Sequence, residues 1–377
     1  MGGNLKEKWN PGMFRYLNKF LLFLGVISGV LAYETHFYPN YYNILSFFSI
    51  LMIALSLIIL RKGVPQRFKI GGFFIINTIP AIVAIISFTH IFSSEIQVSF
   101  EDIARLVSMA LVSNTIYLFM SEDIFIQIID LINSIAIPLA LLNIFIFLRG
   151  NFLLWSTVQM RGASFFFDPN YFALMNDIAI LYSVFYKKGI AAKLINLSIL
   201  IPSVVLTFSR TGVLSLFIIL FLYFILDFKN KKFYWLPFYF VFFLISSYLV
   251  FRLFESLPLY RLGMKLSGRE ELWRNLIVSI KENPLLAFLG EGFQKQSLHN
   301  FLLDYFRAYG IVYIIFIMIL LLGALSLSYK NHRFSFYLIL LFFIFSNFIT
   351  ISLGGIGLFS IIFSSLVILS LFPKLEK

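Results

Sequence analysis

Long apolar runs separated by short polar segments dominate the chain. A helix that crosses a bilayer needs about 20 mostly apolar residues, and twelve runs come close to this length. The runs are continuous, whereas membrane-barrel strands alternate apolar and polar residues, so we predict helices throughout. The predicted spans are residues 17–33, 43–60, 70–92, 103–120, 124–148, 171–186, 194–209, 212–227, 234–252, 300–328, 334–352 and 355–372.

The composition excludes a soluble protein. Of the 377 residues, 60% are hydrophobic and 13% are charged, and the mean hydropathy is +0.91. A soluble domain has about 45–50% apolar and about 25% charged residues, and disorder requires few apolar residues. The expected fold class is therefore all-α, a polytopic integral membrane protein of about 12 transmembrane helices in which residues 1–377 form a single membrane domain. The absence of cysteine excludes disulfides and cysteine-bound metals.

Basic residues orient the predicted helices. If the N-terminus lies inside, the inner loops carry most of the lysines and arginines, as the positive-inside rule requires. The short outer loops then hold only Arg149, Arg161 and Arg210. We therefore predict that both termini are cytoplasmic and that the net charge of +12 reflects orientation, without a nucleic-acid partner. The first apolar run has no small-residue cleavage site, so we expect it to remain as a helix.

Two predicted outer segments, about 149–170 and 253–299, are longer than the other turns. The second lies between spans nine and ten, and its Ser267-Gly268-Arg269-Glu270 sequence has the form of a capping box. The helix that follows is expected to end near Glu282 and to lie on the membrane surface or against the bundle. Its apolar face, at helical spacing, consists of Trp273, Leu276, Ile277 and Ile280.

Two arginines occupy predicted helix starts on the outer side. A cation at a helix N-terminus is locally unfavourable, so a bound anion would explain Arg269, while a surface arginine of an ordinary amphipathic helix is the alternative. Arg210 lies between spans seven and eight, which are joined by almost no loop. It either binds an anion or extends to the edge of the membrane.

Two aspartates belong to the start of span six. Asp168-Pro169-Asn170 signals a turn or a helix start, and Asp168 either caps the helix or pairs with an arginine. Asp177 lies two turns further into an apolar run. A carboxylate at that depth is a functional candidate or a structural partner for one of the arginines.

A multiply charged anion suits the outer face as a whole. Arginine binds phosphate through a bidentate fork, and no Asp-x-Asp or similar acidic pair faces outside, so we predict neither a metal nor a cofactor. His299-Asn300 opens span ten, where a histidine is more often structural than catalytic, and Asp304 and Arg307 beyond it are spaced for an ion pair. Four basic residues with candidate roles map to this face, and they are Arg161, Arg210, Arg269 and His299.

These motifs resemble, in their order and spacing, those of the O-antigen ligase and polymerase superfamily, which includes the Wzy-like polymerases. The resemblance covers about residues 150–330, including the long outer loop. Two departures are the phenylalanine and leucine that follow Asn300 and the late glycine, Gly290, after Asn283-Pro284. The motifs are Arg161-Gly162, Asp168-Pro169-Asn170, Thr207-Phe208-Ser209-Arg210-Thr211-Gly212, Ser267-Gly268-Arg269 with Trp273, Asn283-Pro284-Leu285 and His299-Asn300.

The resemblance implies a metal-independent, inverting glycosyltransferase in the bacterial inner membrane, with its active site on the outer face. The donor would be an oligosaccharide on undecaprenyl pyrophosphate. We expect a polymerase of O-antigen, capsule or exopolysaccharide, which transfers the glycan to the non-reducing end of another lipid-linked repeat unit. The resemblance implies catalytic roles for Arg210, Arg269 and His299. The expected substrate-binding residues are Arg161, Asp168, Asn170, Ser209 and Asn300.

Other functions stay open at this point. An O-antigen ligase would transfer the same glycan to lipid A core. A transporter of lipid-linked glycans would place charges near the midplane, where Asp130 and Asp177 are the main candidates. A scaffold without chemistry would not need a cluster of arginines on one face. For the polymerase, the resemblance implies a chain-length co-polymerase and a flippase as partners.

Overall fold

The computed structural model of the chain describes residues 11–34, 40–60, 70–92, 100–149, 164, 166–227, 269–290, 298, 300–347, 349, 351, 353 and 357–372. Its regular structure in these residues is α-helix, apart from one isolated antiparallel bridge between Glu34 and Phe166. The expected all-α fold is confirmed to this extent. The helices are α1 (Pro11–Leu31), α2 (Tyr42–Leu60), α3 (Ile70–Phe92), α4 (Phe100–Phe119), α5 (Glu122–Leu148), α6 (Pro169–Tyr186), α7 (Ile190–Leu206), α8 (Arg210–Asp227), α10 (Arg269–Glu282), α11 (Leu286–Leu289), α12 (Phe301–Asn331), α13 (Arg333–Ser346) and α14 (Leu358–Leu371).

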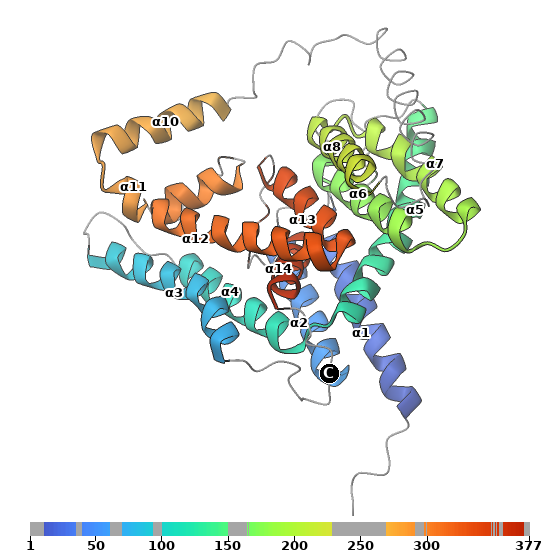
Figure 1. Ribbon diagram of the computed structural model, residues 1–377, viewed down its shortest axis with the longest axis horizontal. Coiled ribbons are helices and arrows are strands. Elements are labelled where there is room, and N and C mark those ends of the chain that lie inside the picture. Colours follow the sequence, from blue (N-terminus) through green and yellow to red (C-terminus); the bar gives the residue numbers. More distant parts are fainter. Residues whose placement is uncertain are drawn as a thin grey trace, which may run out of the picture.

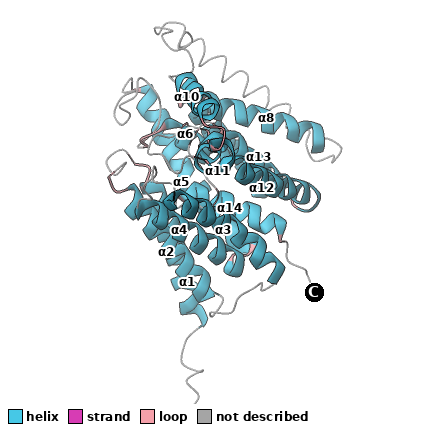
Figure 2. Cartoon of the chain, turned by 90° about the vertical axis from the view of Figure 1, so that its left-hand side faces the viewer, coloured by secondary structure: helices cyan, strands magenta, loops and turns pink. Residues whose placement is uncertain are grey.

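The helices surround a central pair. Helices α13 and α14 lie near the middle of the molecule, with α6, α7 and α8 on one side and α3 and α4 on the other (Figure 1). The start of α1 and helix α10 lie at opposite ends of the molecule (Figure 2). The arrangement therefore separates the N-terminal part of the chain from α10 along the length of the bundle.

Most predicted spans coincide with helices. The predicted span 70–92 has the bounds of α3, and the predicted starts of α5 and α6 differ from the observed ones by two residues. The helix predicted between spans nine and ten is present as α10, which ends at Glu282, and its position on the membrane surface stays a prediction. The span predicted at 234–252 lies outside the described residues. The number of membrane crossings stays a prediction.

Three described helices are long and apolar enough to cross a membrane by length and composition, and they are α2, α5 and α12. Large apolar side chains also point outward along the helices, among them Phe47, Phe145 and Leu322, with exposed fractions of 57%, 50% and 59%. Soluble proteins rarely expose so many neighbouring apolar groups. These helices fit a membrane protein whose outer surface contacts lipid.

The segment between α13 and α14 corrects two predicted boundaries. Helix α13 ends at Ser346 and α14 begins at Leu358, so the helices predicted to reach 352 and to start at 355 are shorter than expected. Ile349, Ile351 and Leu353 are buried although they belong to neither helix. Hydropathy reports burial and not helicity, which is why the sequence extended both helices into this segment.

The long helix α12 is broken at Gly310, where φ is 73° and ψ is −175°. Gly290 follows α11 with almost the same backbone, at φ 74° and ψ 178°. This region of the backbone map is open essentially to glycine alone. A Cβ on Gly290 would collide with the carbonyl of Ala308, and one on Gly310 with the carbonyl of Phe288. The two glycines therefore let α11 pack directly on the break in α12, which the sequence did not predict.

The helix ends gather at two ends of the bundle. At the Asn170 end, the Tyr33 ring after α1 lies 4.4 Å from the Tyr171 ring of α6 and 5.1 Å from the Phe359 ring of α14. At the opposite end, the Glu122 end, Glu122 pairs with His332 at 3.1 Å. These groups of helix ends are the ones that the predicted topology assigns to its outer and inner sides, respectively. Which end faces the cytoplasm stays a prediction.

The glycine contact between α11 and α12 yields a stability test. Replacing Gly310 by alanine should lower the free energy of unfolding by about 1–3 kcal/mol from backbone strain alone, and by more because of the collision with Phe288. Thermal unfolding of the protein in detergent measures the loss. Gly189→Ala is the matched control, since Gly189 has φ 87° but no atom within 4 Å of an added Cβ. Equal losses in the two variants would contradict close packing at Gly310.

Candidate functional site

Helix α6 begins as its sequence predicts. Asp168 is the N-cap residue, and its Oδ1 accepts a hydrogen bond of 2.8 Å from the backbone N–H of Asn170. Pro169 occupies the first turn, where its missing N–H costs nothing. The capping role expected of Asp168 is confirmed. Within the described part of the chain, Asp168 forms no ion pair with an arginine.

Helix α8 begins after a reversal of only three residues. Phe208 has φ 50°, an uncommon value for a residue other than glycine. The hydroxyl of Thr207 donates to the carbonyl of Val204 at 2.6 Å and accepts from the backbone N–H of Ser209 at 3.1 Å. Ser209 then caps α8, because its Oγ accepts from the backbone N–H of Gly212 at 3.0 Å.

The starts of α6 and α8 are joined. The Ser209 hydroxyl donates to Oδ1 of Asn170 at 2.7 Å. Below this bond the helices are in close contact, since a Cβ on Gly212 would lie only 2.7 Å from the Cβ of Ala173. Two positive helix-dipole ends therefore lie side by side. Arg210, the first residue of α8, adds its charge there and its side chain is exposed.

The start of α12 lies at the same end of the bundle. Asn300 caps α12 by accepting from the backbone N–H of Leu303 at 3.0 Å, and its amide donates to the carbonyl of Asn347 at 3.4 Å. Asn347 ends α13. The other end of α13 packs against the C-terminal end of α6, where the Phe334 and Tyr186 rings are 4.9 Å apart. Since α13 spans the bundle, its end at Asn347 lies with the start of α6.

Helix α10 is hydrogen-bonded to the segment just before α12. Trp273 of α10 donates its indole N–H to the carbonyl of Leu298 at 3.2 Å. The backbone N–H of Leu298 in turn donates to Oδ1 of Asp304 at 2.6 Å. Asp304 also pairs with Arg307 at 4.0 Å, which confirms the predicted ion pair. One polar chain thus connects α10 with the first turn of α12.

The apolar face predicted for α10 is only partly covered. Leu276 is buried and Trp273 is partly buried, but Ile277 is 55% exposed. Phe288 in α11 is exposed as well. The covered side faces the bundle, and the exposed side fits a helix that also touches the membrane surface.

The structure brings together four of the predicted site residues, Asp168, Asn170, Ser209 and Arg210. Asn300 lies at the same end but contacts α13. Arg161 and His299 lie outside the described residues, as does the side chain of Arg269, whose backbone begins α10. Their arrangement stays a prediction.

A ring cluster beside the starts of α6 and α14 was not predicted. Phe166 stacks on Tyr33 at 6.4 Å, and Tyr42 meets the edge of Tyr33 at 5.4 Å. Glu34, next to Tyr33, is 7% exposed. Aromatic walls with a few polar groups are typical of ligand sites, but the same rings also pack the segment after α1 against the start of α6. The Tyr33-Glu34 pair at the end of an apolar run was the available signal.

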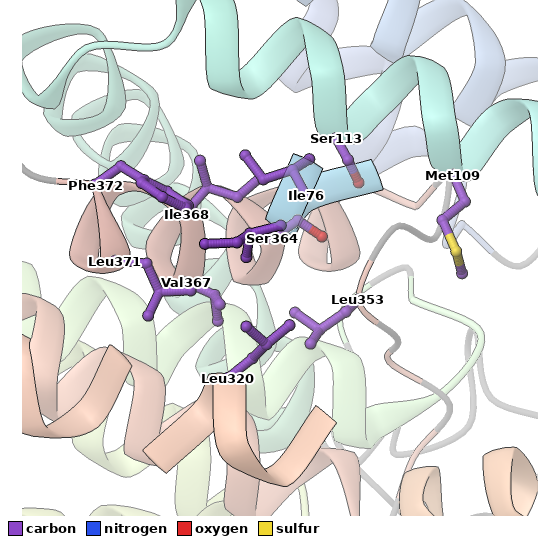
Figure 3. Close-up of a pocket in the computed structure, with 11 residues that line it drawn as sticks. Ile76, Met109, Ser113, Leu320, Leu353, Ser364, Val367, Ile368, Leu371 and Phe372 are labelled. Carbon is purple, nitrogen blue, oxygen red and sulfur yellow. The ribbon is translucent and has the colours of Figure 1, made fainter. Parts of the chain in front are cut away.

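No metal site adds to this picture in the described residues. No three histidine, aspartate or glutamate side chains gather there in a way that could hold a metal ion, and the prediction of a metal-free site stays a prediction. A cavity of about 30 Å³ lies elsewhere, between α3, α4, α12 and α14 (Figure 3). It has room for about one water molecule, and its lining, including Ile76, Leu320 and Phe372, is mostly apolar.

The bond between α6 and α8 can be tested directly. Ser209→Ala removes the cap of α8 and the contact with Asn170, so the free energy of unfolding should fall by about 1 kcal/mol or more. Ser209→Thr retains a capping hydroxyl and should recover most of the loss. Ser198→Ala is a matched control, because that exposed serine bonds only within its own helix. Unfolding midpoints that are the same for Ser209→Ala and Ser198→Ala would contradict the joint role of Ser209.

Comparison with protein-family models, with curated proteins and with solved structures found no match to this chain. The likeness to the O-antigen ligase and polymerase superfamily therefore rests on the sequence motifs. The geometry adds an independent observation, which is the exposed Arg210 at two joined helix starts.

Proposed function

We propose that the protein is a membrane-embedded glycosyltransferase that polymerises a surface polysaccharide. It takes a glycan from undecaprenyl pyrophosphate and transfers it to the non-reducing end of another lipid-linked repeat unit. The observation that carries the proposal is the position of Arg210 at the joined starts of α6 and α8. An arginine beside two positive dipole ends suits a dense negative charge such as a pyrophosphate.

Local structure supports Arg210 as an anion ligand. The turn from Thr207 to Ser209 is fixed by side-chain hydrogen bonds, and Ser209 is buried. Arg210 is exposed, and it belongs to the first turn of α8, whose backbone the Ser209 cap holds in place. The backbone position of its charge, beside the start of α6, is therefore fixed.

The contact between Trp273 and Leu298 supports a joint role for Arg269 and His299. Trp273 follows Arg269 by about one helical turn, and Leu298 directly precedes His299 in the chain. This hydrogen bond thus connects the segment that carries the Arg269 motif with the segment that carries the His299 motif. In the proposed site, Arg269 is a second ligand of the pyrophosphate, and His299 faces the acceptor sugar.

The proposed reaction is a single inverting displacement. The acceptor hydroxyl oxygen forms a bond to the anomeric carbon as the bond from that carbon to the phosphate oxygen breaks. The electron pair leaves with the pyrophosphate, whose growing charge Arg210 and Arg269 stabilise. His299 takes the hydroxyl proton, since the ordinary pKa of histidine is near physiological pH. Asp168 is the alternative base, although its Oδ1 already caps α6.

Reconstitution tests the function itself. The purified protein in liposomes, with EDTA, an undecaprenyl-pyrophosphate repeat unit and no lipid A core, should produce a ladder of longer lipid-linked glycans. Transfer that occurs only after lipid A core is added would replace the polymerase by the ligase. With a verified substrate, no transfer to either acceptor would exclude both enzymes and leave transport of lipid-linked glycans, which a flux assay measures.

Substitution of Arg210 tests the site. Arg210→Ala should lower the rate of polymer formation by about 100-fold or more, because a preorganised charge on the leaving group is lost. Arg210→Lys keeps the charge but not the fork and should retain part of the rate. Arg149→Ala is the matched control, since Arg149 caps the end of α5 and lies over the Phe145 ring at 4.5 Å. Normal polymer from Arg210→Ala, at equal protein level, would show that Arg210 has no such role.

A further inference from the structure

Buried polar residues continue from the joined helix starts into the bundle. Asn143 of α5 donates to the Ser203 hydroxyl of α7 at 3.2 Å, and Asn176 of α6 approaches the same hydroxyl at 3.5 Å. Toward the Glu122 end, Asn196 of α7 donates to Ser183 of α6 at 3.0 Å. The contact surfaces of α5, α6, α7 and α8 are therefore not purely apolar, and the carboxylic acid Asp177 lies among them.

Asp177 has an unusual environment for a carboxylate. Its side chain is fully buried, and its Oδ2 lies 3.3 Å from the hydroxyl of Ser215 in α8. Its Oδ1 has no hydrogen-bond partner in the described part of the chain. No arginine, lysine or histidine among the described residues pairs with it. The arginine partner that the sequence suggested for Asp177 is therefore not found there.

Ionisable groups on the surrounding helices either contact other residues or lie at helix ends, away from Asp177. Asp177 lies nine residues after Asp168, about 13 Å further along α6. Arg210, the first residue of α8, lies beside the start of α6 and therefore away from Asp177. Asp130 of α5 is half-exposed and pairs with Lys187 at 3.6 Å, beyond the end of α6, so it is not an isolated midplane charge. Lys193 of α7 donates to the Val184 carbonyl at 2.6 Å, and Arg333 of α13 lies over the Tyr329 ring at 3.7 Å. Tyr223 of α8 packs on the rings of Phe185 and Tyr337, and Asp227 is the last residue of α8.

The contacts of Ser215 leave a charge on Asp177 without a counter-charge in the described part of the chain. The Ser215 Oγ lies 3.0 Å from the carbonyl of Gly212 and 3.3 Å from Oδ2 of Asp177. A serine hydroxyl has one hydrogen, so it cannot donate to both acceptors. If Ser215 donates along the shorter contact, to Gly212, the second contact needs a proton on Asp177 or a metal cation between the two oxygens.

We propose that Asp177 is a binding site for one monovalent cation, H⁺ or Na⁺, between α6 and α8. The cation removes the cost of an isolated buried charge. A proton makes Asp177 a donor to Ser215, and Na⁺ would instead take oxygens from Asp177 and Ser215. This inference does not rest on glycan transfer, since it uses only the contacts around Asp177.

Occupancy of the site also bears on the geometry above it. Gly212 is the residue whose backbone N–H Ser209 caps, and its carbonyl accepts from Ser215. The contacts from Asp177 through Ser215 therefore end in the first turn of α8, beside Arg210. Loss of the cation would leave a bare charge between α6 and α8 and weaken the contact that aligns their starts.

Infrared spectroscopy of the full-length protein in lipid nanodiscs tests the site. At neutral pH in potassium buffer, the carbonyl band of a protonated carboxylic acid should be present in the wild type and absent from Asp177→Asn. Asp130→Asn is the matched control and should keep the band, because Asp130 is ion-paired and half-exposed. Replacing K⁺ by Na⁺ separates the two cations. A band that persists assigns H⁺, and a band that disappears in Na⁺ assigns exchange with Na⁺.

Sodium binding and thermal stability provide two further tests of the site. If no acid band is seen in potassium, equilibrium dialysis with radioactive Na⁺ should show retention by the wild type but not by Asp177→Asn. The unfolding midpoint of Asp177→Asn should stay near that of the wild type, since a neutral amide can keep the contact with Ser215. Absence of both the band and Na⁺ retention, or a large loss of stability that Asp177→Glu restores, would overturn the proposal in favour of a paired anion.

Discussion

The backbone groups at helix ends constrain this structure most strongly. Inside a membrane every N–H and C=O must find a partner within the protein, and a helix satisfies all of them except those of its first and last turns. The chain meets this requirement at the Asn170 end with side chains. Asp168, Ser209 and Asn300 each cap the helix that follows them. The polar residues that this constraint demands are also the ones that position the candidate site.

Ser209 shows how capping and packing become one interaction. Its Oγ accepts from the backbone of α8 and donates to Asn170 of α6. One hydroxyl therefore satisfies a helix end and fixes the relative position of two helices. Gly212 and Ala173 then allow the helices to approach closely below it. A larger residue at Gly212 would separate the starts of α6 and α8 and move Arg210 away from the positive end of α6.

The sequence predicted what hydropathy and local capping signals encode. It predicted the bounds of α3, the extent of α10 and the cap at Asp168, because each depends on neighbouring residues alone. It did not predict the break at Gly310 or the short helix α11, because these depend on a contact between segments far apart in the chain. Likewise, the motifs selected Asp168, Asn170, Ser209 and Arg210 but not the cluster around Tyr33, because its ring contacts join segments far apart in the chain.

Arg210 and Asp177 illustrate how depth decides the state of a charge. Both lie on the paired helices α6 and α8, and both are next to a serine that also bonds to α8 backbone. Arg210 lies at the helix start and is exposed, so it can keep its charge and present it to an anion. Asp177 is fully buried, where an isolated charge is costly. We infer that a small cation neutralises the carboxylate of Asp177 at that depth, whereas the exposed Arg210 is the proposed anion ligand at the end of the same helix pair.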